Sequence, residues 1–202
     1  MRKVFGISCI ILGILCLLTA IGCVGYNRLE SDNGEKDAQS LLEQLQAGMD
    51  EAEGSETELP TENGLVPVVP QMQTVPLGNY ESIGILSIPV LEVELPVLTD
   101  WSYEKLRKAP CHYYGSYYES DFVIAAHNYS SHFGRLNKLQ QGDLVLFTDV
   151  TGAVHCYEVV LLETLMPTAT EEMITSGFDL SLYTCTPGGR SRVTVRCRTV
   201  DP

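Results

Sequence analysis

The chain has 202 residues, which is enough for one domain of ordinary size with accessory segments. Its 13 Lys and Arg residues stand against 26 Asp and Glu residues, a formal net charge of −13 at pH 7. An acidic chain of this kind offers no basic face to neutralise phosphates, which argues against nucleic acid as a partner. Three of the seven cysteines lie in an apolar run and the others show no zinc-type spacing, so the sequence indicates neither a disulfide scaffold nor a metal site.

The first predicted element, residues 1–25, is a membrane anchor. After two cations at Arg2 and Lys3, the chain runs from Val4 to Val24 without a charge. A run of about 20 apolar residues spans a bilayer as a helix. Because the next cation is Arg28, the positive-inside bias places the rest of the chain outside the cytoplasm. Two alternatives stay open: a cleaved signal peptide, and lipidation at Cys23, which ends a loose lipobox (TAIGC).

The second predicted element, residues 26–76, is an acidic flexible tether. Between Tyr26 and Val75 the chain holds eleven Asp and Glu residues against Arg28 and Lys36, and its end is rich in proline. Acidic composition with few aromatic residues is typical of chain without a core. Leucines at helical spacing allow a few helical turns between Lys36 and Met49.

The third predicted element, residues 77–202, is a globular domain of a common size. Its pattern consists of short runs rich in β-branched and aromatic residues, bounded by Gly, Pro, Asn or Asp. Six strands are predicted: Ile83 to Ile88, Asp121 to His127, Asp143 to Thr148, Val154 to Glu163, Leu180 to Cys185, and Arg192 to Val200. Two short helices are predicted, one at Ser102 to Lys108 and one near Thr168, where the sequence has capping-box form. Many short strands with few helices indicate an all-β fold, a closed or nearly closed barrel.

A candidate nucleophile and a candidate cation lie on the last two predicted strands. Alternation puts Ser181, Tyr183 and Cys185 on one strand face, and the strand stops at Pro187 in a sequence suited to a tight turn. If the next strand pairs antiparallel across that turn, Arg192 lies near the thiol and can hold a carbonyl oxygen as charge develops on it. The alternatives are an inert buried cysteine and a solvated basic strand face, which would suit the later arginines Arg196 and Arg198 better than Arg192.

A candidate base ends an earlier predicted strand, at His127. A thiol of ordinary pKa is only about 3% thiolate at neutral pH, so a cysteine nucleophile needs a base or a local field. Three other histidines, His112, His132 and His155, compete for this role, and spacing alone does not choose among the four.

Several segments together resemble one known family. Thr184-Cys185 ends a Leu-x-Leu strand and is followed by Arg192, which resembles the Thr-Leu-x-Thr-Cys…Arg signature of sortases. Ala125-Ala126-His127 is similar to their Ala-Gly-His strand end, with Ala126 in place of Gly. The segments 88–97, 109–116 and 132–143 also resemble the family, so the likeness covers nearly the whole predicted domain.

The resemblance implies a closed eight-stranded β-barrel transpeptidase on the outer face of a bacterial membrane. Cys185 would attack a sorting signal, Leu-Pro-x-Thr-Gly-like, of a surface protein, and an amine such as that of a lipid-linked peptidoglycan precursor would resolve the thioester. His127 would move protons, Arg192 would position substrate and stabilise the oxyanion, and Thr184 would help line the site. This chemistry needs no metal or organic cofactor, and the acids Glu119 and Asp121 give no support for calcium.

Three other assignments were weighed. The chain ends soon after the arginine strand and shows no clear lid motif, which favours a class D-like or other single-anchor protein-anchoring enzyme over a pilin-polymerising one. An L,D-transpeptidase would need a Ser-x-Gly-Cys-x-Arg motif, which the residues around Cys185 do not supply. A non-catalytic binding module with the same fold would have no reason to keep Cys185, His127 and Arg192.

Overall fold

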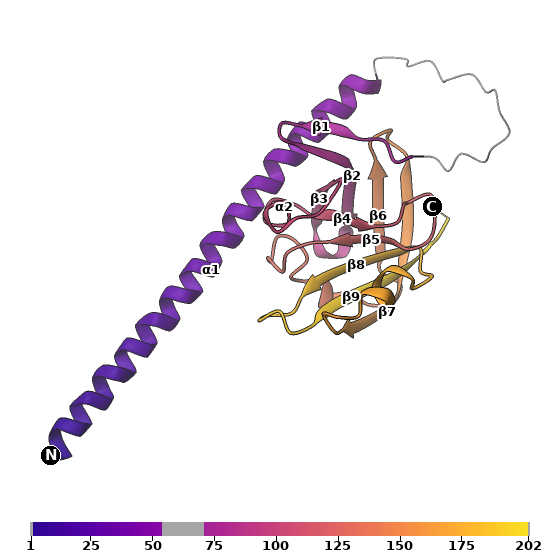
Figure 1. Ribbon diagram of the computed structural model, residues 1–202. Coiled ribbons are helices and arrows are strands. Elements are labelled where there is room, and N and C mark those ends of the chain that lie inside the picture. The colour runs from indigo at the N-terminus through magenta and orange to yellow at the C-terminus, as the bar shows by residue number, and fades with distance from the viewer. Residues whose placement is uncertain (1, 54–70, 202) are drawn as a thin grey trace, which may run out of the picture. The chain divides into compact units, whose positions relative to one another are not determined.

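The computed structural model describes residues 2–53 and 71–201, with side chains described for 10–49 and 71–201 (Figure 1). It divides into two compact units, Met1–Asn33 and Gly34–Pro202. The first unit belongs to helix α1 (Arg2–Glu53). Within the described ranges, α1 is the one helix long and apolar enough to cross a membrane, a property that a signal sequence near the N-terminus shares. Its apolar side chains from Ile10 to Leu29 are exposed.

The second unit contains a closed β-barrel. Its strands are β1 (Val75–Leu77), β2 (Tyr80–Ile88), β3 (Val93–Leu98), β4 (Cys111–Tyr114), β5 (Phe122–Ala125), β6 (Leu144–Asp149), β7 (Val154–Leu165), β8 (Leu180–Cys185) and β9 (Arg192–Thr199). Eight of them follow the order β2-β3-β4-β5-β8-β9-β7-β6, and the pairing of β2 with β6 closes the ring. The strand β1 pairs antiparallel with the first three residues of β2 and is not part of the closed ring. Because β3–β4 and β5–β8 are parallel pairs, the barrel is mixed. The closed eight-stranded form that the resemblance implies is confirmed.

Alternating apolar side chains fill the barrel, and one glycine permits its closure. Phe122, Phe147 and Val195 are among the fully buried residues of the core. At the closing seam, Gly84 pairs with Asp149 at a φ of 151°. A Cβ atom there would lie 2.2 Å from the Thr148 carbonyl oxygen, so a larger residue would push the two strands apart.

Part of the predicted tether is instead a docked helix. Residues 34–49 of α1, the docked segment, bury Gly34, Ala38, Leu41 and Leu45. These positions recur at helical spacing and so form one stripe. Ala38 joins the main core, and Leu41 and Leu45 pack on a second cluster of buried residues: Leu77, Ile85, Leu98, Ala109, Cys111 and Val150. The sequence predicts an extended tether with a few helical turns between Lys36 and Met49, whereas the structure is helical throughout residues 26–53. Composition alone does not reveal the partner surface of the buried stripe. The remaining tether residues 54–70 lie outside the described part of the chain.

Four short helical turns connect the strands. They are η1 (Pro89–Leu91), α2 (Tyr103–Leu106), η2 (Leu136–Lys138) and α3 (Thr170–Ile174). The helix expected after Ser102 is present, and the Ser102 side chain accepts a hydrogen bond from the Lys105 amide at 3.1 Å. The capping box expected at Thr168 is wrong: α3 starts one residue later, so its N-cap is Ala169, which has no side-chain acceptor.

Candidate active site

The tight turn after β8 brings Cys185 and Arg192 together. The two residues face each other in the antiparallel register of β8 and β9. Between them, Gly188 and Gly189 adopt positive φ angles of 84° and 70°, which few other residues accept. The Gly189 amide donates to the Thr186 carbonyl at 2.7 Å and tightens the turn. The expected pairing of these strands is thus confirmed.

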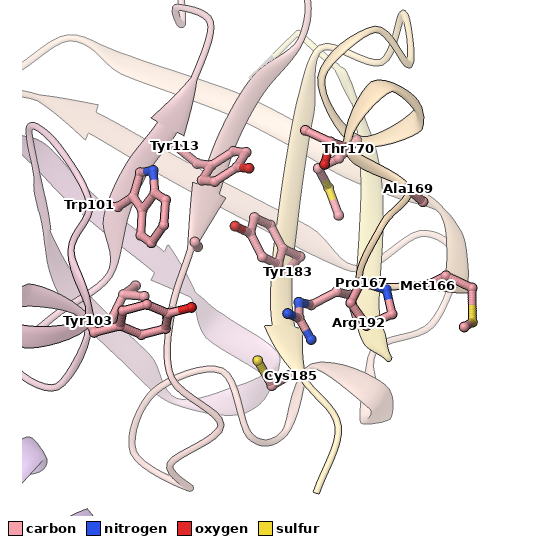
Figure 2. A pocket seen from close by; sticks show the side chains of 14 residues that line it. Trp101, Tyr103, Tyr113, Met166, Pro167, Ala169, Thr170, Tyr183, Cys185 and Arg192 are labelled. Carbon is pink, nitrogen blue, oxygen red and sulfur yellow. The ribbon is translucent and has the colours of Figure 1, made fainter. Parts of the chain in front are cut away.

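The guanidinium of Arg192 is fixed by the same turn. Its Nη1 donates to the carbonyl oxygens of Gly189 and Ser191, both at 3.2 Å. Figure 2 shows the guanidinium beside the Cys185 thiol and the Tyr183 ring, at the edge of a cleft that all three line. A fixed cation beside a thiol can stabilise both a thiolate and an oxyanion.

The parallel pairing of β5 with β8 brings together the ends of the two chain segments that carry His127 and Cys185. Ala125 pairs with Tyr183, and the Ala126 amide donates to the Tyr183 carbonyl at 3.2 Å. His127 lies two residues beyond Ala125, and Cys185 lies two residues beyond Tyr183, so both follow the same pair of strand ends. The His127 ring lies on the Tyr129 ring, with centroids 4.7 Å apart and planes at 10°. It does not line the cleft, although Ala126 directly before it does.

The side chain of Thr184 links the end of β8 to the segment that follows β5. Its side chain is only 3% exposed, and its hydroxyl donates to the Ala126 carbonyl at 2.8 Å. It does not line the cleft. The resemblance implies that Thr184 helps to line the site. In the structure, Thr184 can affect the site only by setting the relative position of the segments that carry His127 and Cys185.

An aromatic wall that the sequence reasoning missed forms one side of the cleft. Trp101 packs against Tyr103 and Tyr113, with ring centroids 5.9 and 5.6 Å apart, and Tyr113 packs against Tyr183 at 5.3 Å. Burial raises the pKa of Tyr183, so its hydroxyl stays protonated. The only tryptophan of the chain, placed after a strand and close to several tyrosines, was the available signal.

The opposite wall is largely apolar and comes from α3 and the segment that joins it to β7. It consists of Met166, Pro167, Ala169, Thr170 and Met173 (Figure 2). The cleft between the two walls has a volume of about 150 Å³. A cleft with largely apolar walls and a thiol at its edge suits a ligand with apolar groups.

A buried arginine holds this second wall, which corrects the expectation of a solvated basic strand face. Arg196 is only 2% exposed. Its guanidinium donates to the Glu163 carboxylate at 2.7 Å, the Ser181 hydroxyl at 2.8 Å, and the carbonyls of Glu172 and Met173 at 2.7 and 3.3 Å. Alternation along the strand could not show this, because α3 covers the outer face of β8 and β9 at that point.

Two other cysteines and the three competing histidines have structural surroundings. Cys111 and Cys197 are fully buried, and burial raises the pKa of both thiols to about 12. Each competing histidine contacts a protein oxygen through a ring nitrogen: His112 the Thr99 and Gly115 carbonyls, His132 the Gly34 carbonyl, and His155 the Asp149 carboxylate. Of these four histidines, His127 is the one that follows the end of β5, the strand that pairs with β8.

The described residues contain no group of three or more His, Cys, Asp or Glu side chains placed to hold a metal ion. Asp121, one of the two acids considered for calcium, has a local structural role. Its Oδ1 accepts hydrogen bonds from the Ser176 hydroxyl and the Gly177 amide, both at 2.8 Å.

A closed mixed barrel with a half-exposed thiol and a fixed arginine at the ends of paired strands is the architecture of a cysteine transpeptidase. Comparison with known families matches the sortase domain to residues 86–200, and the chain belongs to the sortase family. Comparison with curated protein sequences gives no match.

Solved sortase structures are similar to the chain over most of the barrel. Sortase A from Corynebacterium diphtheriae, a lid mutant, has 26% identity and a TM-score of 0.56 over 62% of this chain and 73% of its own. Sortase C from Streptococcus pneumoniae has 25% identity and a TM-score of 0.55 over 79% and 89%. A Clostridium perfringens sortase D5 has 17% identity and a TM-score of 0.56 over 82% and 97%, which supports the fold.

Proposed function

We propose that this protein is a membrane-anchored sortase that attaches surface proteins to the cell wall. The apolar part of α1 holds it in the membrane, and the barrel lies outside the cell. It cleaves a Leu-Pro-x-Thr-Gly-like sorting signal near the C-terminus of a surface protein and transfers the new acyl group to an amine, such as that of a lipid-linked peptidoglycan precursor. The observation that carries the proposal is the pairing of Cys185 with Arg192 at the edge of the cleft.

In the first half-reaction, the Cys185 thiolate attacks the scissile carbonyl and forms a C–S bond. The negative charge on the carbonyl oxygen is stabilised by Arg192, whose orientation the Gly189 and Ser191 carbonyls fix before the reaction begins. The peptide C–N bond then breaks, and protonated His127 gives its proton to the departing amine. A thioester on Cys185 remains.

In the second half-reaction, the acceptor amine attacks the thioester carbonyl. His127 takes the proton that the amine loses, the C–S bond breaks, and a new amide links the surface protein to its acceptor. The thiolate of Cys185 is regenerated. The two walls of the cleft hold the acyl fragment through both steps, which keeps the reacting carbonyl beside the thiol.

A peptide panel tests this function. The full chain in detergent micelles is incubated with peptides that vary each position of the sorting motif, together with oligoglycine, diaminopimelate or lysine as acceptor amine. We expect cleavage of one motif class and ligation to one class of amine, and neither with the Cys185→Ala variant. Saturable peptide binding without any cleavage would instead identify a non-catalytic binding module.

A second candidate, pilin polymerisation, is favoured by one observation. The similar Streptococcus pneumoniae sortase C is described by its pilin substrate specificity. The two functions differ in the acceptor: a polymerising enzyme uses a lysine side chain of a folded pilin, whereas an anchoring enzyme uses a cell-wall precursor amine. The acceptor arm of the panel therefore separates them.

A further inference from the structure

A tyrosine outside the cleft lies against the proposed catalytic histidine. The rings of His127 and Tyr129 are nearly parallel, at 10°, with centroids 4.7 Å apart. In this arrangement Tyr129 covers one face of the imidazole and restricts its rotation, because any turn of the ring loses the stacking contact. The direction in which His127 can exchange a proton thus depends on where the Tyr129 ring lies.

The backbone around Tyr129 is held in a compact loop. The Tyr129 carbonyl accepts hydrogen bonds from the amides of His132 and Gly134, at 3.0 and 2.9 Å. The Phe133 amide donates to the His127 carbonyl at 3.2 Å and closes the same loop. A Cβ atom on Gly134 would lie 2.7 Å from the Tyr129 carbonyl oxygen, so the loop has no room to relax there.

The docked segment of α1 lies directly behind the Tyr129 ring. A Cβ atom on Gly34 would lie 2.8 and 2.9 Å from two carbons of that ring, closer than side chains pack, so Gly34 and the ring are in full contact. The neighbouring His132 donates from Nε2 to the Gly34 carbonyl at 3.3 Å. Burial lowers the pKa of His132 to about 4, so this donor is a neutral imidazole at physiological pH.

Further contacts fix how far the docked segment extends along the barrel and how it is rotated about its own axis. One turn after Gly34, Asp37 forms an ion pair with Lys108 at 2.8 Å. The hydrogen bond to Asp37 raises the pKa of Lys108. Beyond it, Leu41 and Leu45 are buried on the barrel. The position of Gly34, and with it the space available to Tyr129, is therefore set by the whole docked segment.

We propose that Tyr129 is a positioning residue for His127 and that Gly34 of α1 keeps it in place, so that the docked segment is part of the catalytic unit. The proposal rests on the proposed role of His127 in proton transfer. Its physical basis is that misplacement of a reacting group by about 1 Å costs up to roughly 100-fold in rate. A helix that is present only to connect the barrel to an anchor would have no such effect on the chemical step.

The test uses the full chain in micelles and the sorting peptide found by the panel. We expect Tyr129→Ala to lower kcat by about tenfold or more while KM stays nearly constant, because His127 and not the cleft is disturbed. Tyr129→Phe keeps the stacked ring and should restore most of the rate. Gly34→Ala should lower kcat in the same way, since its new Cβ displaces the ring.

Gly25→Ala is the matched control for Gly34→Ala. It makes the same substitution in the same helix, with the same gain of about 1 kcal/mol in helix propensity. A Cβ atom at Gly25 would meet nothing within 4 Å beyond the adjoining backbone of its own helix. It should leave kcat unchanged. In a double-mutant cycle, Gly34→Ala should add little further loss once Tyr129→Ala has removed the ring with which it collides, because the remaining close neighbour of its Cβ is the Arg107 carbonyl oxygen at 3.2 Å.

Two outcomes overturn the inference without touching the proposed function: His127→Ala inactive but Tyr129→Ala fully active, or Tyr129→Phe as impaired as Tyr129→Ala. Activity retained in His127→Ala would overturn the proposed function itself. A readout independent of turnover is the rate at which diethyl pyrocarbonate modifies His127, mapped by mass spectrometry. We expect a severalfold faster reaction in Tyr129→Ala and Gly34→Ala, and an unchanged rate in both contradicts the inference even if no peptide is cleaved.

Discussion

Replacement of Arg196 by methionine tests how the apolar wall of the cleft is held. The guanidinium makes four hydrogen bonds to oxygen, and two of them go to carbonyls in the last turn of α3, Glu172 and Met173. Methionine keeps most of the apolar stem of arginine but donates to none of these acceptors. Glu163 and Ser181 also lose their donor, and the Glu163 charge is left without its partner.

The expected loss of stability follows from burial. Removal of one partner of a buried ion pair costs about 3–5 kcal/mol. Because the Glu163 side chain is 31% exposed and can regain water, we expect the lower end, about 3 kcal/mol. For a unit of this size that corresponds to a Tm lower by about 6–12 °C.

Arg198→Met is the matched control on the same strand face. The Arg198 side chain is 47% exposed, and its ion pair with Asp179 spans 3.5 Å, so its loss should cost at most about 1 kcal/mol. Both variants are measured by calorimetry and in the peptide assay. Since Thr170 and Met173 line the cleft, Arg196→Met should also raise KM. Equal Tm shifts for the two variants, or an unchanged KM in Arg196→Met, would refute this account of the wall.

Three further predictions concern single side chains. Arg192→Lys should lose most turnover in the peptide assay, because an ammonium cannot reproduce the planar fork of donors. Arg190→Lys, in the turn, should stay near wild type. Equal losses in the two variants would mean that the pairing of Arg192 opposite Cys185 plays no part in turnover. Cys111→Ala and Cys197→Ala should keep activity and the wild-type rate of thiol alkylation, since burial raises both thiol pKa values to about 12; loss of alkylation in either would contradict this. Burial lowers the pKa of His132 to about 4 from 6.5, so the unfolded chain binds the proton more readily, and the Tm should fall as pH drops from 6.5 toward 4. His132→Gln should flatten that part of the Tm–pH curve, and an unchanged slope would show that the group does not titrate as proposed.

The hairpin that carries the site was predictable because its information is local. The strand ending at Cys185, the Gly188-Gly189 turn and the strand starting at Arg192 lie within one short stretch, and alternation plus turn chemistry gave their pairing. The predicted strands agree with the structure within a few residues. The short β4 (Cys111–Tyr114) and β3, which contains Pro96, were not predicted from pattern, because length and proline both weaken the signal.

The remaining features depend on partners far away in the chain. From its place in the strand pattern alone, Arg196 is indistinguishable from a solvated cation. The groups that surround it, Glu163 and α3, lie more than 20 residues earlier in the chain. The docked segment reads as acidic spacer, because its stripe is short and the surface that buries Leu45 is built from strands that come later in the chain. The contact of Gly34 with Tyr129 likewise joins residues almost 100 positions apart, and no local pattern encodes it.

The most direct test of the central claim is the mass of the enzyme during turnover. The full chain is mixed with the sorting peptide without an acceptor amine, quenched in acid, and measured intact and after proteolysis. We predict an added mass equal to the acyl fragment of the peptide, located on Cys185, lost on treatment with hydroxylamine and absent in Cys185→Ala. Cleavage of the peptide with no adduct, or an adduct located on Cys111 or Cys156, would contradict the assignment of Cys185 as the nucleophile.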